Sequence, residues 1–411
     1  MVVQAMQDII IEKPYRFQTP YQSTLAPYLF QRFRLVDRFL RHYEGICSHE
    51  VRGIEHLKES LRRQAGIVLA PNHCRYSDPL AMAWVLRPAG VYPYAMASWH
   101  LFHHSFAQSQ LIRLCGGFSV NREAVDRQAL DMAVSGLVEG QRPLILFPEG
   151  TVFRSNDRLQ PFLDGVAFIA RTAARRRAKQ GKSSTVIHPV AIKYLFQGDV
   201  IQTITPVVEE MEHRFAWYLP TCRARTMVER VSRLTDAYLV TKEIEHCGSV
   251  AQGNSQERRL QLIEQLLRPL EKQWLKNSPK ETTLVPRIKA LRLLMMPLLL
   301  SDQTPPREKQ QIRLDLSRIY TAQQIGSYPE GYLDSPVTNT RLLETVEQLE
   351  EDIWGKARVH KPLHAILQVG PAIEVTDQRP AKESVDPLME QLETRIREML
   401  VELSSQAQVV A

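Results

Sequence analysis

Between residues 50 and 200, short apolar runs alternate with longer stretches that have the 3.6-residue periodicity of helices. The apolar runs have the length of strands, and helix candidates lie between them at 122–140 and 162–180. The runs are GIVLA (66–70), VYPYAMA (91–97), GGFSV (116–120), PLILF (143–147) and VIHPVAI (186–192). This alternation predicts an α/β fold with a largely parallel sheet flanked by helices and with ligand-binding groups at the carboxyl ends of the strands.

After residue 200 the periodicity changes and the chain becomes mostly helical. Apolar residues recur there at spacings of three and four, first over 260–274 and again over 342–353. We expect Pro269 to kink or break the first of these helices, because proline lacks a backbone N–H. Strand character returns at HAILQVGPAIEV (364–375), and a final amphipathic helix follows at 386–403.

These patterns divide the 411 residues into four parts. A mostly helical insertion interrupts an α/β core, which a late strand and helix then complete. The parts are an N-terminal amphipathic helical region (1–49), the core (50–200), the insertion (201–361) and the closing strand and helix (362–405).

The N-terminal region contains a candidate amphipathic helix at 20–46 with arginines on its polar side. Such a helix fits an anionic membrane surface as well as it fits the surface of its own domain. The net charge of +7 suits an anionic partner such as phospholipid headgroups, a phosphorylated cofactor or nucleic acid, but it fits an ordinary basic surface equally well. No stretch reaches the roughly 18 apolar residues of a membrane-spanning helix, and the nearest candidate, 291–300, is interrupted by Pro297.

The five cysteines are widely spaced and form no Cys-x-x-Cys pair. Their odd number and spacing predict a reducing compartment and argue against a disulfide framework or a zinc finger. The first residues lack the basic segment and apolar core of a signal peptide. We therefore expect a cytoplasmic protein that associates peripherally with a membrane.

The segment APNHCRYSDPLAM (70–82) joins an apolar run to a helix candidate. Asp78 precedes Pro79, which predicts an extended Asp78 at the N-cap of the helix. A loop before that cap can fold back and bring the carboxylate of Asp78 to the imidazole of His73, leaving the other ring nitrogen free as a base. The alternative is that Asp78 only caps the helix and His73 is a solvated loop residue.

Two further loops place polar residues at neighbouring strand ends. PLILFPEGTVFRS (143–155) puts Glu149 and Gly150 directly after an apolar run, and GGFSVNRE (116–123) ends another run with Arg122. Because the carboxyl ends of parallel strands share one edge of the sheet, we expect these side chains to lie near His73 and Asp78.

Four blocks of the sequence resemble the glycerolipid acyltransferase family, which includes lysophosphatidic acid and glycerol-3-phosphate acyltransferases. NHCRYSD (72–78) is similar to the His-x-x-x-x-Asp block of that family, and the other blocks follow in order. They are GGFSVNR (116–122), FPEGT (147–151) and VIHPVAI (186–192). The resemblance extends over roughly residues 50 to 200 and includes the closing strand and helix, whereas the insertion has no counterpart that we recognise.

The resemblance implies transfer of an acyl group from a thioester, carried by acyl-CoA or acyl-carrier protein, to the hydroxyl of a lysophospholipid. It implies 1-acylglycerol-3-phosphate as the first choice of acceptor, an anionic membrane as the partner surface, no cofactor and no nucleic acid. His73 would be the general base, oriented by Asp78, and Arg122 would hold the acceptor phosphate. Glu149, Gly150 and Thr151 would shape the acceptor site, where backbone N–H groups can stabilise an oxyanion.

The chain departs from the family at positions that contact phosphate. Arg75 replaces a serine that the family often carries two positions after the histidine, and Ser98-Trp99-His100-Leu101 replaces a frequent Lys-x-Glu-Leu run. The arginine that usually follows the Glu-Gly-Thr run is displaced to Arg154. Arg75 or Arg154 is a candidate for the missing cation.

Three other hypotheses remain open. Within the same class, the acceptor is glycerol-3-phosphate or another lysolipid. In a second, the chain is a catalytically silent membrane scaffold with the same fold. In a third, His73, Asp78 and Glu149 bind the metal of a hydrolase. The helical spacing of His100, His103 and His104 also permits metal binding, but these histidines lack a nearby carboxylate in the sequence.

Overall fold

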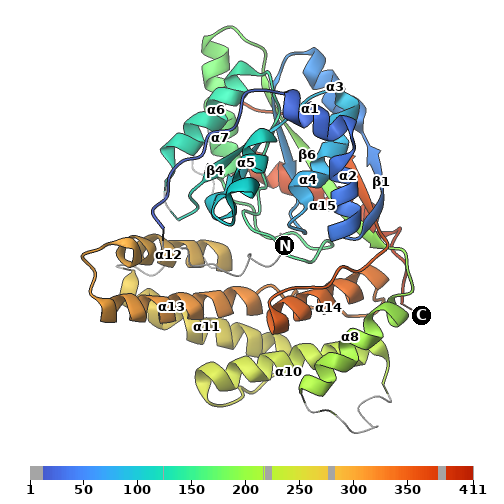
Figure 1. Ribbon diagram of the computed structural model, residues 1–411, viewed down its shortest axis with the longest axis vertical. Coiled ribbons are helices and arrows are strands. Elements are labelled where there is room, and N and C mark those ends of the chain that lie inside the picture. Colours follow the sequence, from blue (N-terminus) through green and yellow to red (C-terminus); the bar gives the residue numbers. More distant parts are fainter. Residues whose placement is uncertain are drawn as a thin grey trace.

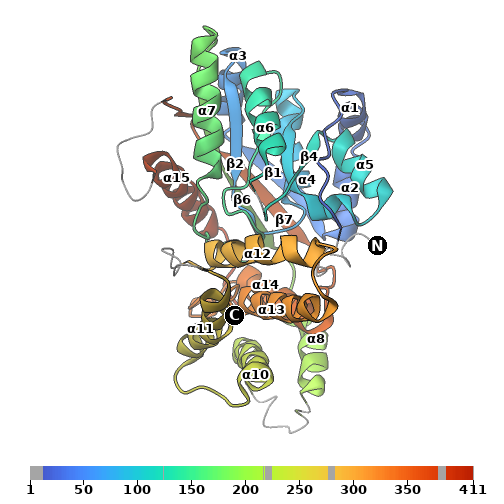
Figure 2. The ribbon, with the colours of Figure 1, turned by 90° about the vertical axis from the view of Figure 1, so that its left-hand side faces the viewer.

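We describe the protein from a computed structural model, which covers residues 13–123, 125–215, 217, 225–275, 283–377 and 386–410. An α/β part contains the sheet and the helices that flank it. A helical segment, residues 200–354, lies against one end of this part (Figures 1 and 2). The α/β fold with a helical insertion, predicted from the alternating apolar runs, is confirmed.

The sheet has eight strands in the order β1-β7-β6-β2-β5-β3-β4, with β8 pairing with β6 as well. Among the described strands, every pair is parallel except β6 with β7 and β6 with β8. The strands are β1 (Ile46–Arg52), β2 (Gly66–Pro71), β3 (Tyr94–Ser98), β4 (Gly117–Val120), β5 (Leu144–Ile145), β6 (Thr185–Phe196), β7 (Leu363–Val369) and β8 (Ile373–Glu374).

The central strand β2 carries apolar side chains to both faces of the sheet, as expected for a strand that helices cover on both sides. Ile67 and Leu69 join the core of one face, and Val68 and Ala70 join the core of the other. The first core continues into the helical segment, whereas the second is closed by α6 (Arg127–Glu139), α7 (Gly165–Lys179) and α15 (Pro387–Ser404).

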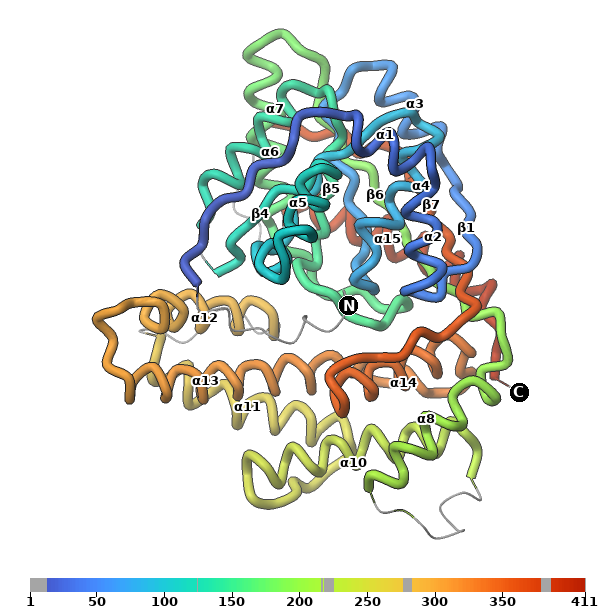
Figure 3. Tube along the Cα trace, viewed as in Figure 1, coloured from blue at the N-terminus to red at the C-terminus, as the bar shows by residue number. Residues whose placement is uncertain are grey.

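Shorter elements complete the α/β part around the first face and the edge of the sheet. They are α3 (Ile54–Arg62), α4 (Asp78–Leu86), η1 (Arg87–Ala89), η2 (Trp99–Phe102) and α5 (Phe106–Leu114). Strand β7 follows the whole helical segment in sequence, yet it lies between β1 and β6 (Figure 3).

The helical segment lies between β6 and β7 in the sequence. Its described helices are α8 (Val200–Arg214), α10 (Met227–Cys247), α11 (Ser255–Trp274), α12 (Leu284–Leu300), α13 (Pro306–Ile325) and α14 (Asn339–Trp354). Of the predicted kink or break at Pro269, the break does not occur, because α11 continues through this residue. Among the described residues, no helix is both long and apolar enough to cross a membrane.

The N-terminal region folds as two short helices, α1 (Leu25–Arg32) and α2 (Leu35–Tyr43), rather than the single helix predicted over 20–46. The break lies at Arg34, whose φ of 50° is in the left-handed region and cannot continue a right-handed helix. Helix α2 buries Leu40 in the core. On and next to α1, Leu25, Leu29 and Phe33 are exposed.

Candidate functional site

His73 and Asp78 meet where β2 ends and α4 begins. Nδ1 of His73 lies 2.9 Å from Oδ2 of Asp78. Asp78 is the first residue of α4, so the N-cap lies at Ser77, one residue earlier than the predicted N-cap at Asp78. Its Oδ2 also accepts hydrogen bonds from the backbone N–H groups of Cys74 and Arg75, both at 2.8 Å. Asp78 therefore holds the preceding loop in a conformation that places the imidazole of His73 beside the carboxylate of Asp78.

The carboxylate of Asp78 is fully buried, and its other oxygen, Oδ1, accepts a hydrogen bond of 2.7 Å from the hydroxyl of Tyr194. Hydrogen bonds of this kind stabilise a buried carboxylate that has lost its hydration. The ring of His73 stacks on Phe147 with centroids 4.0 Å apart. With Nδ1 engaged by Asp78, Nε2 is the ring nitrogen that can accept a proton.

Glu149 joins the loop after β5 to the loop that holds His73. Its Oε1 accepts a hydrogen bond of 2.7 Å from the backbone N–H of His73, and its Oε2 accepts one of 2.9 Å from that of Gln160. Burial raises the pKa of Glu149 to about 8, although both backbone hydrogen bonds oppose this shift. In this structure, Glu149 therefore fixes the backbone on both sides of the site.

The turn at Gly150 needs glycine because φ is +69° and a Cβ there would lie 2.4 Å from Cδ1 of Leu163. Arg122, which follows β4, donates from Nη1 to the carbonyl oxygen of Gly150 at 2.6 Å. Thr151 is half-buried beside it. The structure thus brings His73, Asp78, Arg122 and the 149–151 turn together at one edge of the sheet.

Arg75 and Arg154 are directed to the helical segment. Arg75 is buried and donates to both carboxylate oxygens of Glu347, at 3.3 and 2.6 Å. Arg154 donates to Glu347 at 3.2 Å and to Glu351 at 2.8 Å. Burial by itself raises the pKa of Glu347, but Arg75 and Arg154 outweigh burial and lower it. The two arginines hence attach both loops of the site to α14.

Sequence reasoning missed Tyr194, Glu347 and the role of Asn72. The side chain of Asn72 exchanges two hydrogen bonds with the backbone of Ile192, which joins the end of β2 to β6. The position of Tyr194 could have been predicted from the alternation of side chains along a strand. Ile192 and Tyr194 are two residues apart on β6, so they face the same side of the sheet. Glu347 lies 272 positions from Arg75, and no signal in the sequence connects them.

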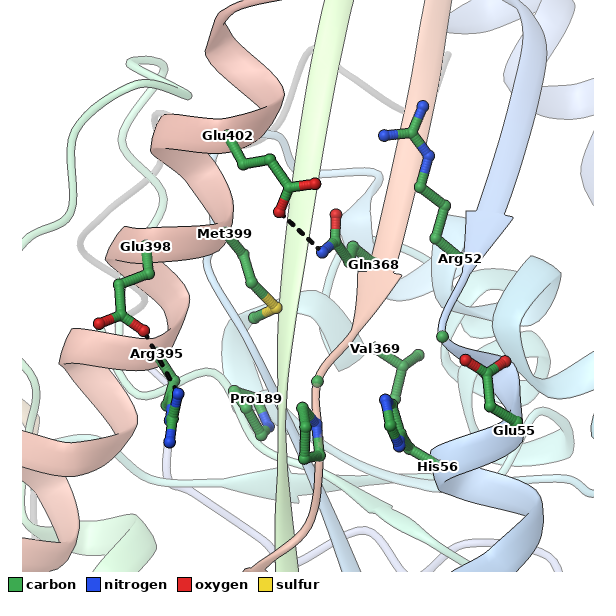
Figure 4. Close-up of a pocket in the computed structure, with 13 residues that line it drawn as sticks. Arg52, Glu55, His56, Pro189, Gln368, Val369, Arg395, Glu398, Met399 and Glu402 are labelled. Carbon is green, nitrogen blue, oxygen red and sulfur yellow. Dashed lines mark hydrogen bonds and ion pairs between the residues drawn. The ribbon is translucent and has the colours of Figure 1, made fainter.

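Two cavities lie away from this edge. One, of about 370 Å³, lies between α3, α15 and the ends of β1 and β7 (Figure 4). In its lining, Arg395 pairs with Glu398, and Gln368 donates a hydrogen bond to Glu402. The other, of about 320 Å³, lies in the helical segment beside Ser155. Within the described parts of the chain, no group of three or more His, Cys, Asp or Glu side chains is arranged to hold a metal ion.

Comparison with models of protein families matches residues 50–193 to the family described as Acyltransferase. The matched range begins in β1 and ends in β6, so it includes His73, Asp78, Arg122 and Glu149. No curated protein matches the chain.

Proposed function

Because residues 50–193 form a domain of the acyltransferase family, we propose that the protein transfers a fatty acyl group from a thioester to the free hydroxyl of a lysophospholipid. The donor is acyl-CoA or acyl-carrier protein, and the acceptor that we favour is 1-acylglycerol-3-phosphate. The hydrogen bond of 2.9 Å between His73 and Asp78, at the carboxyl end of β2, carries this proposal. No cofactor is required, because the thioester supplies the activated acyl group.

In the proposed reaction, Nε2 of His73 takes the proton of the acceptor hydroxyl while the hydroxyl oxygen attacks the thioester carbonyl. A tetrahedral oxyanion forms, and its collapse breaks the carbon–sulfur bond. The imidazolium then returns the proton to the departing thiolate, so an ester and a free thiol leave the site. The carboxylate of Asp78 stabilises the imidazolium at its Nδ1. No acyl-enzyme intermediate is needed.

The acceptor phosphate is assigned to the edge of the sheet that carries Arg122. This exposed residue already contacts the turn at Gly150, which places a cation beside the loop that holds His73. Guanidinium groups bind phosphate oxygens with paired hydrogen bonds. Arg75 and Arg154 bind Glu347 and Glu351 instead, so Arg122 is the cation that we assign to the phosphate.

We further propose that the protein works at an anionic membrane surface on the cytoplasmic side, bound through α1 and α2. This region exposes Leu25, Leu29 and Phe33 next to arginines at 32, 34 and 38. Apolar side chains that enter the interface and cations that meet anionic headgroups are the two components of peripheral binding.

A matrix of donors and acceptors, with release of free thiol as the readout, tests the function. We expect thiol release with acyl-CoA or acyl-carrier protein and 1-acylglycerol-3-phosphate, and roughly 10²- to 10⁴-fold less with His73→Ala, the usual contribution of a general base. Glycerol-3-phosphate and other lysolipids in the same matrix identify a different acceptor. Full activity of His73→Ala would contradict the mechanism. Vesicle binding without turnover on any acceptor would favour a scaffold.

A further inference from the structure

Helix α12 exposes leucine side chains on one half of its surface. Leu293, Leu294 and Leu298 are 41, 39 and 37% exposed. Since successive residues of a helix are about 100° apart, these leucines lie on the same half of the helix as Lys289. The other half is buried in the core through Ile288, Leu291, Met295, Met296 and Leu299. Helix α12 is therefore apolar on two sides, and other described parts of the chain cover one of them.

The charged residues of α12 are all basic. Residues 284–300 include two arginines and one lysine but no aspartate or glutamate. Arg287 pairs with Glu264 and Glu271, whereas Lys289 is exposed on the side of the leucines. Apolar side chains beside a cation are the combination that binds an anionic phospholipid surface. A second copy of the chain fits this side less well, because its own α12 would bring another lysine and no carboxylate.

The opposite side of α12 reaches the edge of the sheet that carries the site. Figures 1 and 2 show α12 between the α/β part and the other helices of the segment. From α12, Nη2 of Arg292 donates to Oε1 of Glu123, the residue that follows Arg122. Only about 10 Å, the diameter of a helix, therefore separates the exposed leucines from the loop after β4.

An acceptor with a long acyl chain requires contact between the site and a bilayer. Each methylene group that passes from lipid into water lowers the equilibrium by a factor of about four. A lysophospholipid therefore reaches the protein from the membrane rather than through solution. If α12 lies in the membrane interface, Arg122 and the turn at Gly150, which are in contact with each other, come next to the lipid headgroups.

We infer that Leu293, Leu294 and Leu298, together with Lys289, form a second membrane-binding surface, whose partner is an anionic phospholipid bilayer. We call these four residues the leucine surface of α12. The inference rests on the proposed function and deepens it, because it assigns a role to the helical segment. Helices α1 and α2 attach the protein to the membrane, and the leucine surface of α12 holds the site beside the lipids on which it acts.

Co-sedimentation with vesicles of phosphatidylcholine and phosphatidylglycerol tests the leucine surface of α12 in the full-length protein. Transfer of the exposed part of each leucine into lipid is worth a factor of roughly three to seven. We therefore expect the triple variant Leu293→Ser, Leu294→Ser and Leu298→Ser to weaken vesicle binding by roughly 30-fold or more. Lys289→Ala keeps all three leucines, and it should weaken binding roughly fivefold and reduce its dependence on salt. This variant provides the test if the triple variant is not folded by circular dichroism.

The matched control replaces three exposed apolar residues around the connection between α10 and α11. Both helices lie on the side of α12 away from the α/β part (Figures 1 and 2). Their replacement by serine should change vesicle binding by less than about twofold. The control variant is Ile244→Ser, Val250→Ser and Leu260→Ser, at positions that are 54, 46 and 54% exposed. Equal losses of binding in the two triple variants would overturn the inference.

Kinetics with two acceptors separates the leucine surface of α12 from the proposed function. With 1-acylglycerol-3-phosphate in vesicles, we expect the leucine variant to raise KM by the factor by which it weakens binding. With a short-chain acceptor in solution, kcat and KM should not change.

Vesicle binding that the leucine variant leaves unaltered would overturn the inference and leave the proposed function standing. A wild-type dimer in analytical ultracentrifugation that the leucine variant abolishes, with vesicle binding unaltered, would assign the surface to a second copy instead. Vesicle binding that depends on the leucines in a protein without acyl transfer to either acceptor would keep the membrane surface and reject the proposed function.

Discussion

At the scale of single residues, the carboxylate of Asp78 has two tasks that one substitution can separate. It holds the loop through two backbone N–H groups, and it faces Nδ1 of His73. We expect Asp78→Asn to keep the fold, because an amide oxygen still accepts the loop hydrogen bonds. It should lower kcat by roughly 10²- to 10⁴-fold, because the charge that stabilises the imidazolium is lost. Thiol-release kinetics and thermal unfolding measure the two effects.

Tyr194→Phe is the control for this prediction. It removes the hydrogen bond to Oδ1 of Asp78 but leaves the contact with His73. We expect a loss of about 1 kcal/mol in stability and less than about tenfold in kcat. Equal losses of kcat in Asp78→Asn and Tyr194→Phe would show that the charge of Asp78 has no special role.

Glu149 makes stability depend on pH. Burial raises its pKa from the ordinary value of 4.5 to about 8 in the folded protein. A raised pKa means that the folded state binds the proton more tightly than the unfolded state. The contribution of Glu149 to the free energy of unfolding is therefore fully present below about pH 4.5 and is lost as the pH rises through about 8.

The expected result is that Glu149→Gln, which is neutral at every pH, reduces the free energy of unfolding more at low pH than at high pH. Denaturant titrations at about pH 5 and about pH 9 give the comparison. A difference between wild type and variant that is constant with pH would contradict the prediction. The substitution also leaves one of the two backbone N–H donors without an acceptor, which adds a cost of about 1–3 kcal/mol at every pH.

Part of this site was predictable residue by residue. The carboxyl ends of parallel strands share one edge of the sheet, and this rule was sufficient to predict that four residues lie close together. Each of them closely follows a strand: His73, Asp78, Arg122 and Glu149. The partners of Arg75 and Arg154 were not predictable. Their carboxylates come from α14, and an amphipathic pattern shows which face of a helix is buried but not which loop covers it.

At the scale of elements, α14 connects the helical segment to the site through Glu347. The carboxylate is buried and accepts hydrogen bonds from both Arg75 and Arg154. We expect Glu347→Gln to destabilise the protein by about 3–5 kcal/mol, because it leaves the buried charge of Arg75 without its main partner. Chemical denaturation measures the loss, and acyl transfer should fall with it because Arg75 lies in the loop of His73.

Glu398→Gln on α15 is the matched control. Its pair with Arg395 has an N–O distance of 3.5 Å and is largely exposed, so its loss should cost less than about 1 kcal/mol. If the two substitutions cost the same, then the contact between α14 and the loop does not stabilise the site.

Two helices differ from their predictions for physical reasons. Pro269 removes one hydrogen bond of α11 at a cost of about 3 kcal/mol, but Leu266, Leu267 and Leu270 are buried on that helix, each worth about 1.5–3 kcal/mol. Packing therefore keeps α11 continuous. The break at Arg34 could not be predicted, because no proline or glycine marks it in the sequence and the left-handed conformation of Arg34 is seen only in the structure.

At the scale of the whole molecule, the proposed membrane surface predicts binding to anionic vesicles. Phe33→Ser removes an exposed aromatic side chain, so we expect it to weaken binding by roughly tenfold or more, from the usual value of burying such a group. Salt should weaken the binding of the wild type, because screening reduces the attraction of the arginines to anionic lipid.

Val401→Ser on α15 provides the control, since Val401 is even more exposed, at 69%. Vesicle co-sedimentation measures both variants. Equal losses for Phe33→Ser and Val401→Ser would place the membrane surface elsewhere, and binding insensitive to salt would remove the role of the arginines.

The position of β7 determines how late in synthesis the sheet can be completed. Among the described strands, β1 pairs with β7 alone, and the contact of Ser48 with His364 spans 316 positions. Strand β1 must therefore remain without this partner while the strands of the site and the entire helical segment emerge. A nascent chain released before residue 363 would contain His73, Asp78 and Glu149 but would have an open edge at β6. We expect such truncated products to aggregate rather than to act as smaller enzymes.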